Sequence, residues 1–419
     1  MNQNDILRFS LKGVTIYRDL MEDPVLAKLR KLTGKQFQSA EQVAEIYAEM
    51  FCELASSPFC GNLTDYVYDL VLHAENLFTL SCARGGFESL PALLTGAARS
   101  DLQALSLLAH TPAAELKAHL ADCFPDYAAL IAKLPDYETG HSRFAFDGWD
   151  DLRALAESVT QRGYGRFGRW RSFTFECELG EAELIPITHP DEITLADLKG
   201  YERERGTILE NTEALMRGVR ANNILLYGDR GTGKSSTVKA IVNALAPRGL
   251  RLVEVAKHNL RHLGRLIDRL AGVPMKFIVF ADDLSFSESD DSYTALKAVL
   301  EGSSNKLPDN MVIYATSNRR HLIQETFSSR GDDEVHLGDT LDETVSLSDR
   351  FGITVTFTTP KKAEFMEIVR QLAADHGLSL PVDTLESGAN SWATRRGSFS
   401  PRTAKQYVNY LLARENGQS

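Results

Sequence analysis

The sequence has few cysteines, and their spacing does not suggest a structural role. Cysteine occurs five times in 419 residues, which is an odd number, and no two cysteines form a Cys-x-x-Cys pair. Neither a disulfide framework nor a zinc knuckle is therefore supported. The simplest interpretation is that these cysteines serve as small apolar side chains.

The sequence also lacks a hydrophobic run long enough to cross a membrane. Its first residues, Met-Asn-Gln-Asn-Asp-Ile-Leu-Arg, contain neither the basic start nor the apolar stretch of a signal peptide. We therefore expect no membrane partner and a cytoplasmic location.

An excess of positive charge is absent as well. The net charge is −11, which argues against a protein that is coated with nucleic acid but leaves room for a local basic patch. Hydrophobic residues make up 43% and charged residues 25%, as is ordinary for a soluble globular protein. The length exceeds that of a single usual core, so two domains, or two and a small third, are expected.

What the sequence does contain is a phosphate-binding pattern. Apolar residues 224–227 lead into Gly-Asp-Arg-Gly-Thr-Gly-Lys-Ser at residues 228–235, and helical spacing of apolar residues then continues to Pro247. The glycines allow backbone angles that let successive N–H groups face an anion at a helix start. Lys234 is placed to reach the β- and γ-phosphates of a nucleotide, and Ser235 to bind Mg²⁺.

We call residues 228–235 the phosphate loop. The residues expected to bind the nucleotide here are Gly228, Asp229, Arg230, Gly231, Thr232, Gly233, Lys234, Ser235 and Ser236.

The sequence after the phosphate loop alternates strand and helix patterns. Strands are predicted at 251–255, 277–281, 311–316 and 353–357, with helices at 260–270 and 292–300 between the first three, and helices are predicted at 361–376, 382–396 and 401–414. This order predicts an α/β fold with a doubly wound parallel sheet and a small helical lid.

Four segments follow from these patterns. They are a mainly helical N-terminal domain (1–172), a linker with a short β segment (173–189), the α/β nucleotide-binding domain (190–359) and the helical lid domain (360–419).

Two acids follow the apolar strand 277–281, at the end of the sheet where ligands bind. Asp282 is placed to hold Mg²⁺ through a water molecule, together with Ser235. Asp283, one residue further, is placed to orient the water that attacks the γ-phosphate. The alternative is that the two acids only cap a helix and carry surface charge.

The order of motifs in the second half resembles that of AAA+ ATPases. The matching motifs are Asp197-Leu198-x-Gly200, the phosphate loop, Phe277 to Asp283, Ala315 to Asn318, Leu347 to Phe351 and Ser400-Pro-Arg402. More closely, Leu-Tyr-Gly-Asp-Arg-Gly-Thr-Gly-Lys-Ser-Ser, Asp-Asp-Leu-Ser-Phe and Ala-Thr-Ser-Asn-Arg-Arg-His-Leu-Ile resemble bacterial ATPases grouped under domain of unknown function 815. The resemblance covers about residues 190–415.

The resemblance implies ATP and Mg²⁺ as ligands and assigns further roles. Asn318 would be sensor 1 beside the γ-phosphate, and Arg402 would be sensor 2, reaching phosphate from the lid. Arg350 would be an arginine finger that enters the site of a neighbouring subunit, which implies a homo-oligomer. Leu198 and Tyr201 would lie near the adenine. The alternative for Asn318 is a turn residue after a strand. The alternative for Arg350 and Arg402 is an ordinary salt bridge.

One departure from the AAA+ pattern concerns Asp283, where many members of that superfamily have Glu. The carboxylate is one methylene shorter, which withdraws it from the reacting water. We therefore expect hydrolysis to be slow unless the water is bridged differently.

These observations favour an oligomeric ATPase that remodels or loads an unknown protein or nucleic-acid client. The alternative is a slow nucleotide-dependent switch or binding module. A P-loop kinase is disfavoured because no acceptor pocket is evident.

A last candidate is the segment at residues 161–172, where arginines alternate with aromatic residues and glycines. Its arginines could pair with phosphates while Tyr164, Phe167 and Trp170 stack on bases. The other interpretation is a connector whose aromatic residues anchor it to a neighbouring domain. The connector is favoured because the segment is short and the protein is acidic.

Overall fold

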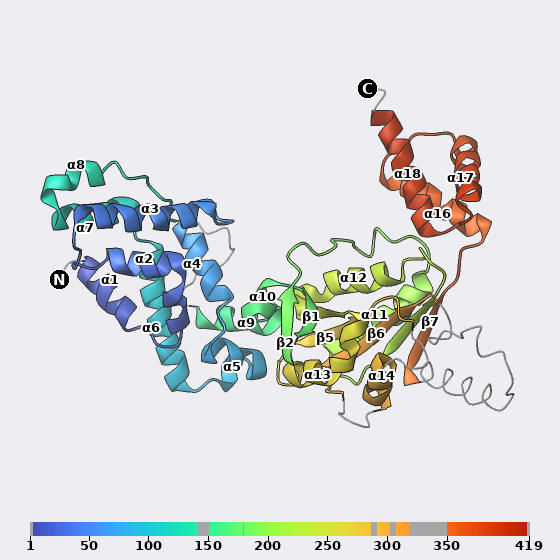
Figure 1. Ribbon diagram of the computed structural model, residues 1–419, viewed down its shortest axis with the longest axis horizontal. Helices are drawn as coiled ribbons and strands as arrows, with labels where there is room; N and C mark the ends of the chain where they lie inside the picture. Colours follow the sequence, from blue (N-terminus) through green and yellow to red (C-terminus); the bar gives the residue numbers. More distant parts are fainter. Residues whose placement is uncertain are drawn as a thin grey trace. The chain divides into compact units, whose positions relative to one another are not determined.

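The computed structural model describes residues 3–140, 151–178, 180–285, 291–301, 307–318 and 350–416. The chain divides into two compact units, residues 1–169 and 170–419 (Figure 1). Each unit has a hydrophobic core of its own, so we describe them separately.

The N-terminal unit is helical, as the sequence predicts. Its helices are α1 (Gln3–Lys12), α2 (Pro24–Leu32), α3 (Ala40–Ser56), α4 (Leu63–Leu72), α5 (Leu77–Gly85), α6 (Ala92–Ala109), α7 (Ala113–Cys123), α8 (Ala128–Ile131), α9 (Leu152–Arg162) and α10 (Gly165–Arg169). Helix α3 shows why they form: Ser39 Oγ accepts a hydrogen bond from Gln42 N at 3.3 Å, which caps the first turn. The apolar face of α3 then packs into the core, with Tyr47 and Met50 fully buried.

The arginine-rich segment supports the connector interpretation. Tyr164 and Phe167 are buried, and Tyr164 belongs to the core of the N-terminal unit, so neither ring is available to stack on a base. Arg169 forms an ion pair with Asp69 of α4. These contacts tie the segment into the protein.

The C-terminal unit is built on a seven-stranded sheet. Its strands are β1 (Ser172–Glu178), β2 (Glu181–Pro186), β3 (Ile224–Gly228), β4 (Leu250–Val255), β5 (Lys276–Ala281), β6 (Met311–Ser317) and β7 (Ile353–Phe357), and their spatial order is β2-β1-β4-β5-β6-β3-β7. All neighbouring pairs are parallel except β1 with β2. The predicted α/β fold with a parallel sheet is therefore confirmed.

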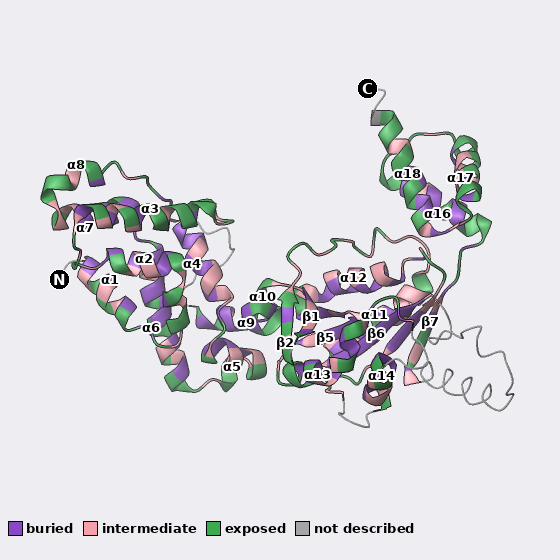
Figure 2. Ribbon diagram, in the orientation of Figure 1, coloured by how far each residue is buried: buried purple, intermediate pink, exposed green. Residues whose placement is uncertain are grey.

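The sheet lies between helices (Figure 1). Helices α11 (Glu202–Met216) and α12 (Lys234–Leu245) share one apolar core with alternate residues of the central strands, such as Leu226 and Ile278. Helices α13 (Leu263–Ala271) and α14 (Asp291–Glu301) lie on the other side of the sheet. Buried residues follow the central strands closely (Figure 2), as expected for strands that are covered on both faces.

The structure differs from the sequence prediction at the linker that was expected over residues 173–189. Strand β1 pairs in parallel with β4, and β2 folds back on β1 through Gly180, so both strands extend the sheet. The physical reason is the alternation of Phe173, Phe175 and Cys177, whose side chains are all buried. A strand with one such apolar face is stable only when it joins a sheet.

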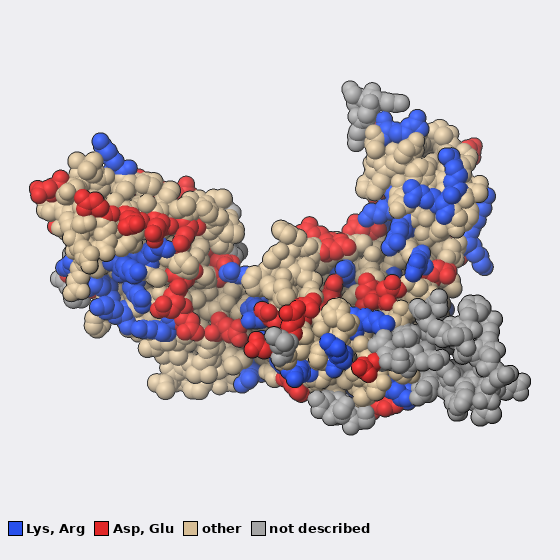
Figure 3. Space-filling model, in the orientation of Figure 1, with Lys and Arg blue, Asp and Glu red and all other residues tan. Residues whose placement is uncertain are grey.

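The lid consists of three helices, α16 (Lys362–Asp375), α17 (Val382–Arg396) and α18 (Pro401–Asn416). They enclose a small core that includes Phe365, Leu385 and Val408. Lys and Arg side chains are numerous on the visible face of the lid (Figure 3). Within the described residues of both units, no helix has the length and apolar character that crossing a membrane requires.

A buried hydrogen-bond network joins β6 to α11. The Tyr314 hydroxyl lies 2.8 Å from Thr212 Oγ1 and accepts from Asn211 Nδ2 at 3.1 Å. Since the Thr212 hydroxyl donates to the Ile208 carbonyl, the Tyr314 hydroxyl donates to Thr212. Burial raises the pKa of Tyr314 to about 12, so its hydroxyl stays protonated at neutral pH.

Tyr314→Phe should lower the free energy of unfolding by roughly 1 to 3 kcal/mol, because it removes two buried hydrogen bonds and leaves their partners unsatisfied. Urea unfolding followed by circular dichroism measures this loss. Tyr227→Phe on β3 is the matched control, since the Tyr227 hydroxyl has no hydrogen bond within the described residues. Equal stability losses in the two variants would contradict the role of the network.

Candidate functional site

The phosphate loop begins where β3 runs against β7. A Cβ atom on Gly228 would lie only 2.1 Å from the Phe357 carbonyl oxygen, and Gly228 has a φ of 136°, so no other residue fits this position. Gly231 and Gly233 have φ values of 78° and 94°, which also favour glycine. The loop then enters α12 at Lys234.

This backbone leaves donors free. The N–H groups of Gly231, Thr232 and Gly233 have no hydrogen-bond acceptor within the described residues. Together with the first turn of α12 they form a set of unsatisfied donors, at the end of a helix dipole that carries partial positive charge. Such a loop is suited to an anion.

Lys234 is held in place by the loop. Its ammonium group donates to the carbonyl oxygens of Gly228 and Asp229, both at 2.8 Å, and to Asn318 Oδ1 at 3.2 Å. Burial lowers the pKa of Lys234 below its ordinary value, while the nearby carboxylates, Asp283 first among them, act in the opposite direction. Additional negative charge in the site would therefore stabilise this cation.

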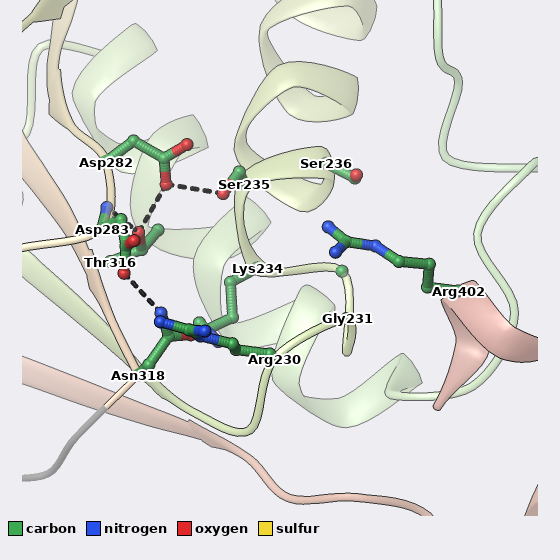
Figure 4. A pocket seen from close by; sticks show the side chains of 11 residues that line it. Arg230, Gly231, Lys234, Ser235, Ser236, Asp282, Asp283, Thr316, Asn318 and Arg402 are labelled. Carbon is green, nitrogen blue, oxygen red and sulfur yellow. Dashed lines mark hydrogen bonds between the residues drawn. The ribbon is translucent and has the colours of Figure 1, made fainter. Parts of the chain in front are cut away.

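The two predicted acids are connected to the loop through β6. Asp282 Oδ1 accepts from Ser235 Oγ at 2.6 Å and from Thr316 Oγ1 at 2.5 Å. The same Thr316 hydroxyl accepts from the backbone N–H of Asp283 at 2.8 Å. Thr316 thus fixes both acids relative to Ser235 (Figure 4).

Asn318 joins the remaining groups. Its Nδ2 donates to Asp283 Oδ1 while its Oδ1 accepts from Lys234. Asp283 has a φ of 52°, in the left-handed region that Asp tolerates better than most residues. The end of β5, the end of β6 and the phosphate loop therefore meet in one hydrogen-bonded cluster, as expected at the carboxyl edge of a parallel sheet.

In the part of the chain that the structure describes, two cavities adjoin the loop. The first, which we call the loop cavity, has a volume of about 460 Å³ and is lined by Arg230, Gly231, Gly233, Lys234, Ser235, Ser236, Asp282, Asp283, Thr316, Asn318 and Arg402. Arg230 and Arg402 have no side-chain hydrogen bond or ion pair within the described residues. Three cations therefore face this cavity, and two of them have unpaired side chains.

The second cavity, which we call the lid cavity, lies between the α/β part and the lid. It has a volume of about 190 Å³, and its lining includes Leu198, Tyr201, Arg205, Thr232, Ile368, Leu372 and Lys405. Gly231, Gly233, Ser236 and Arg402 line both cavities, so the two are adjacent. One ligand could therefore occupy both.

The lid is attached to the loop by the backbone as well as by side chains. Arg402 N donates to Gly231 O at 3.2 Å, which brings the start of α18 against the loop. Asp229 Oδ2 accepts from Thr359 N at 2.7 Å and from Thr359 Oγ1 at 2.6 Å. Tyr201 donates its hydroxyl hydrogen to Thr358 O at 2.6 Å. The segment that leads to the lid is thus anchored on two sides.

The structure brings most of the predicted site residues together and leaves three outside the cavities. Gly228 and Asp229 form the start of the loop, where they contact Phe357 and Thr359. Arg350 forms an ion pair with Glu301 of α14 at 2.5 Å and does not line either cavity. Residues 347–349, which belong to the same predicted motif, lie outside the described residues.

Several lining residues were missed by sequence reasoning. Thr316 lies in the Ala-Thr-Ser-Asn motif, two residues before Asn318, and alternation along β6 could have indicated it. Arg205, Ile368, Leu372 and Lys405 carry no sequence signal, because helices far apart in the chain bring them to the lid cavity.

Comparison with known proteins places the chain in a family. The family described as "Protein of unknown function (DUF815)" matches residues 168–415. The chain belongs to the DUF815 family. The match begins at residue 168, two residues before the C-terminal unit, and covers the α/β part and the lid as far as residue 415. No curated protein matches this DUF815 protein.

Solved structures that match part of the chain include RuvB from Thermotoga maritima. A variant of that RuvB has 17% sequence identity and a TM-score of 0.36, and the match covers 52% of the DUF815 chain and 63% of the RuvB chain. A second structure, described as the RuvB Holliday junction branch migration motor of Thermotoga maritima, has 15% identity and a TM-score of 0.33 and covers 52% and 72% of the two chains.

Asp229→Ala should lower the free energy of unfolding by roughly 1 kcal/mol at neutral pH, since it removes two hydrogen bonds to a carboxylate that solvent partly screens. These bonds hold the pKa of Asp229 below its ordinary value. The difference from wild type should persist above about pH 4 and shrink as pH falls through the pKa of the folded state.

Urea unfolding at several pH values measures this effect. Thr359→Val removes only the hydroxyl bond and should lose less stability than Asp229→Ala. A wild-type unfolding free energy for Asp229→Ala at pH 7 would show that the anchor adds no stability.

Proposed function

We propose that this DUF815 protein binds ATP and hydrolyses it with the help of Mg²⁺. The observation that carries this proposal is the charge arrangement in the loop cavity. Lys234, Arg230, Arg402 and the free N–H groups of the loop face the same space. Each of these groups can donate hydrogen bonds to phosphate oxygens, so the cavity suits an anion with several negative charges, and a nucleotide triphosphate is such an anion.

The residues present fit Mg²⁺ as well. Ser235 Oγ and Asp282 are 2.6 Å apart, and both offer the oxygen ligands that Mg²⁺ prefers. Within the described residues no group of three or more His, Cys, Asp or Glu side chains is close enough to hold a metal by itself. This suits Mg²⁺, which takes one or two protein ligands and completes its shell with phosphate oxygens and water. When bound, the ion would neutralise phosphate charge.

The lid cavity is the proposed position of the nucleoside. Leu198, Tyr201, Ile368 and Leu372 supply apolar surface, while Arg205 and Lys405 supply polar contacts at its edge. Since Gly231 and Gly233 line both cavities, one nucleotide can place its base in the lid cavity and its phosphates in the loop cavity. We assign nucleotide binding to residues 190–359 and the closing lid to residues 360–419.

For hydrolysis, Asp283 is the residue proposed to orient the attacking water. Asn318 contacts both Asp283 and Lys234, so it links the position of the water to the position of the γ-phosphate. Arg402 reaches the phosphates from the lid. Arg350 is proposed to act on the site of a neighbouring copy, because it lies outside the cavities of its own chain. The energy of hydrolysis would then move or load a protein or nucleic-acid client.

Lys234→Ala should abolish ATP hydrolysis and weaken ATP binding by about 10- to 100-fold, because it removes charge-assisted hydrogen bonds to the phosphates. Calorimetric titration with ATP and Mg²⁺ measures the affinity, and phosphate release measures turnover. Lys239→Ala, on the same helix but outside both cavities, is the matched control. Wild-type ATP binding by Lys234→Ala would contradict the proposed function.

Arg350→Ala should leave ATP affinity within about twofold of wild type and remove any rise of specific activity with protein concentration. The reason is that a finger residue completes the site of another subunit. Phosphate release over a hundredfold range of concentration tests this expectation. A rise that persists in Arg350→Ala would exclude Arg350 as the finger.

A slow nucleotide-dependent switch is the second candidate, and one observation favours it. The shorter acid Asp283 has one of its oxygens engaged by Asn318, which leaves it less free to activate water. Tight ATP binding by the wild type, with turnover no faster than that of Lys234→Ala, would support the switch over the ATPase.

A further inference from the structure

Arg230 lies at a position of the phosphate loop where ATP binding alone does not require an arginine. It follows Gly228 by two residues, is exposed, and has no hydrogen bond or ion pair within the described residues. Its side chain is directed toward Asn318, while the Arg402 side chain is directed toward the start of α12 (Figure 4). The two guanidinium groups thus point toward different parts of the loop cavity.

The part of the cavity near Arg230 is the part where hydrolysis would take place. Asn318 contacts both Lys234 and Asp283, which are the groups proposed to hold the γ-phosphate and the attacking water. A guanidinium group directed toward Asn318 therefore lies close to the bond that would break. Arg350 cannot supply this charge from within the same chain, because it is paired with Glu301 and does not line the cavity.

We propose that Arg230 is a catalytic residue that contacts the transferred phosphoryl group from within the same chain. This inference rests on the proposed ATPase function. Arg230 would stabilise the negative charge of the transition state, a role that the resemblance to AAA+ ATPases gives to Arg350 of a neighbouring subunit. Arg230 then supplies part of the stabilising charge from within one chain, and Arg350 of a neighbouring copy adds to the rate when copies associate.

The chemistry explains why a guanidinium is suited to this step. The oxygen of the attacking water forms a bond to the γ-phosphorus, and the bond from that phosphorus to the β–γ bridging oxygen breaks. The electron pair of the broken bond stays on the bridging oxygen, which becomes part of ADP, and the proton of the water passes to the released phosphate or to solvent. Negative charge grows on oxygens that a planar five-donor group contacts well.

The test separates catalysis from binding. Hydrolysis is measured in a single turnover, at a dilution where specific activity no longer varies with protein concentration. Affinities are measured for ATPγS and for ADP with aluminium fluoride, which imitates the transferred phosphoryl group. Arg230→Ala should slow hydrolysis by about 10³-fold and lose the tighter binding of the aluminium fluoride complex, while ATPγS affinity changes by less than about threefold.

Two further variants sharpen the comparison. Arg230→Lys should keep ATPγS affinity and recover only part of the rate, because a lysine is a point charge without the planar fork. Arg220→Ala is the matched control, since Arg220 is exposed and lines neither cavity.

Two outcomes would overturn the inference. They are a wild-type rate in Arg230→Ala and a loss of ATPγS affinity as large as the loss of rate. Failure of the wild-type protein to bind ATPγS is a different result, because it would overturn the proposed function itself.

Discussion

The contact between Gly228 and the Phe357 carbonyl is the constraint on which the rest of the C-terminal unit depends. With a Cβ to oxygen distance of only 2.1 Å for any larger residue, the phosphate loop must begin with glycine and must begin against β7. From that point Asp229 reaches Thr359, and Tyr201 reaches Thr358 while its ring lies 5.1 Å from that of Phe357. The loop, the start of α11 and the segment leading to the lid therefore share one anchor.

A second consequence of this geometry is the balance of charge at the edge of the sheet. Ser235, Asp282, Thr316 and Asp283 form a continuous chain of hydrogen bonds, which Asn318 extends to Lys234. Burial lowers the pKa of Lys234, which disfavours its charged form, while these acids act in the opposite direction. An anion in the loop cavity would add to their effect, which is why the arrangement favours a phosphate ligand over an apolar one.

The two units of the chain differ in what the family match says about them. The match covers residues 168–415 and so spans the unit that holds both cavities. The N-terminal unit has a separate, fully formed core of large buried side chains such as Tyr17 and Phe78, and the Arg169–Asp69 pair ties its last helix to α4. The proposed nucleotide site therefore belongs to the other unit.

The sequence by itself determined the phosphate loop, the five strands from β3 to β7 and the three lid helices, because local periodicity and glycine spacing specify such elements. It also indicated Asp282, Asp283 and Asn318 as candidate site residues, since Asp282 and Asn318 follow a strand directly and Asp283 comes one residue later. It placed β1 and β2 in a linker, and only the pairing of β1 with β4 decided otherwise. Local sequence can show that a segment is extended, but strand neighbours are chosen by contacts between distant residues.

The tertiary structure likewise decided which charged residues face the cavities. Arg230 and Arg402 are far apart in the sequence yet line one space, whereas Arg350 pairs with Glu301. Thr316 belongs to the candidate site only because its hydroxyl contacts both Asp282 and Asp283, the two acids that follow the neighbouring strand β5. Spacing along the chain fixes the type of chemistry, while the direction of each side chain depends on packing, which no local pattern encodes.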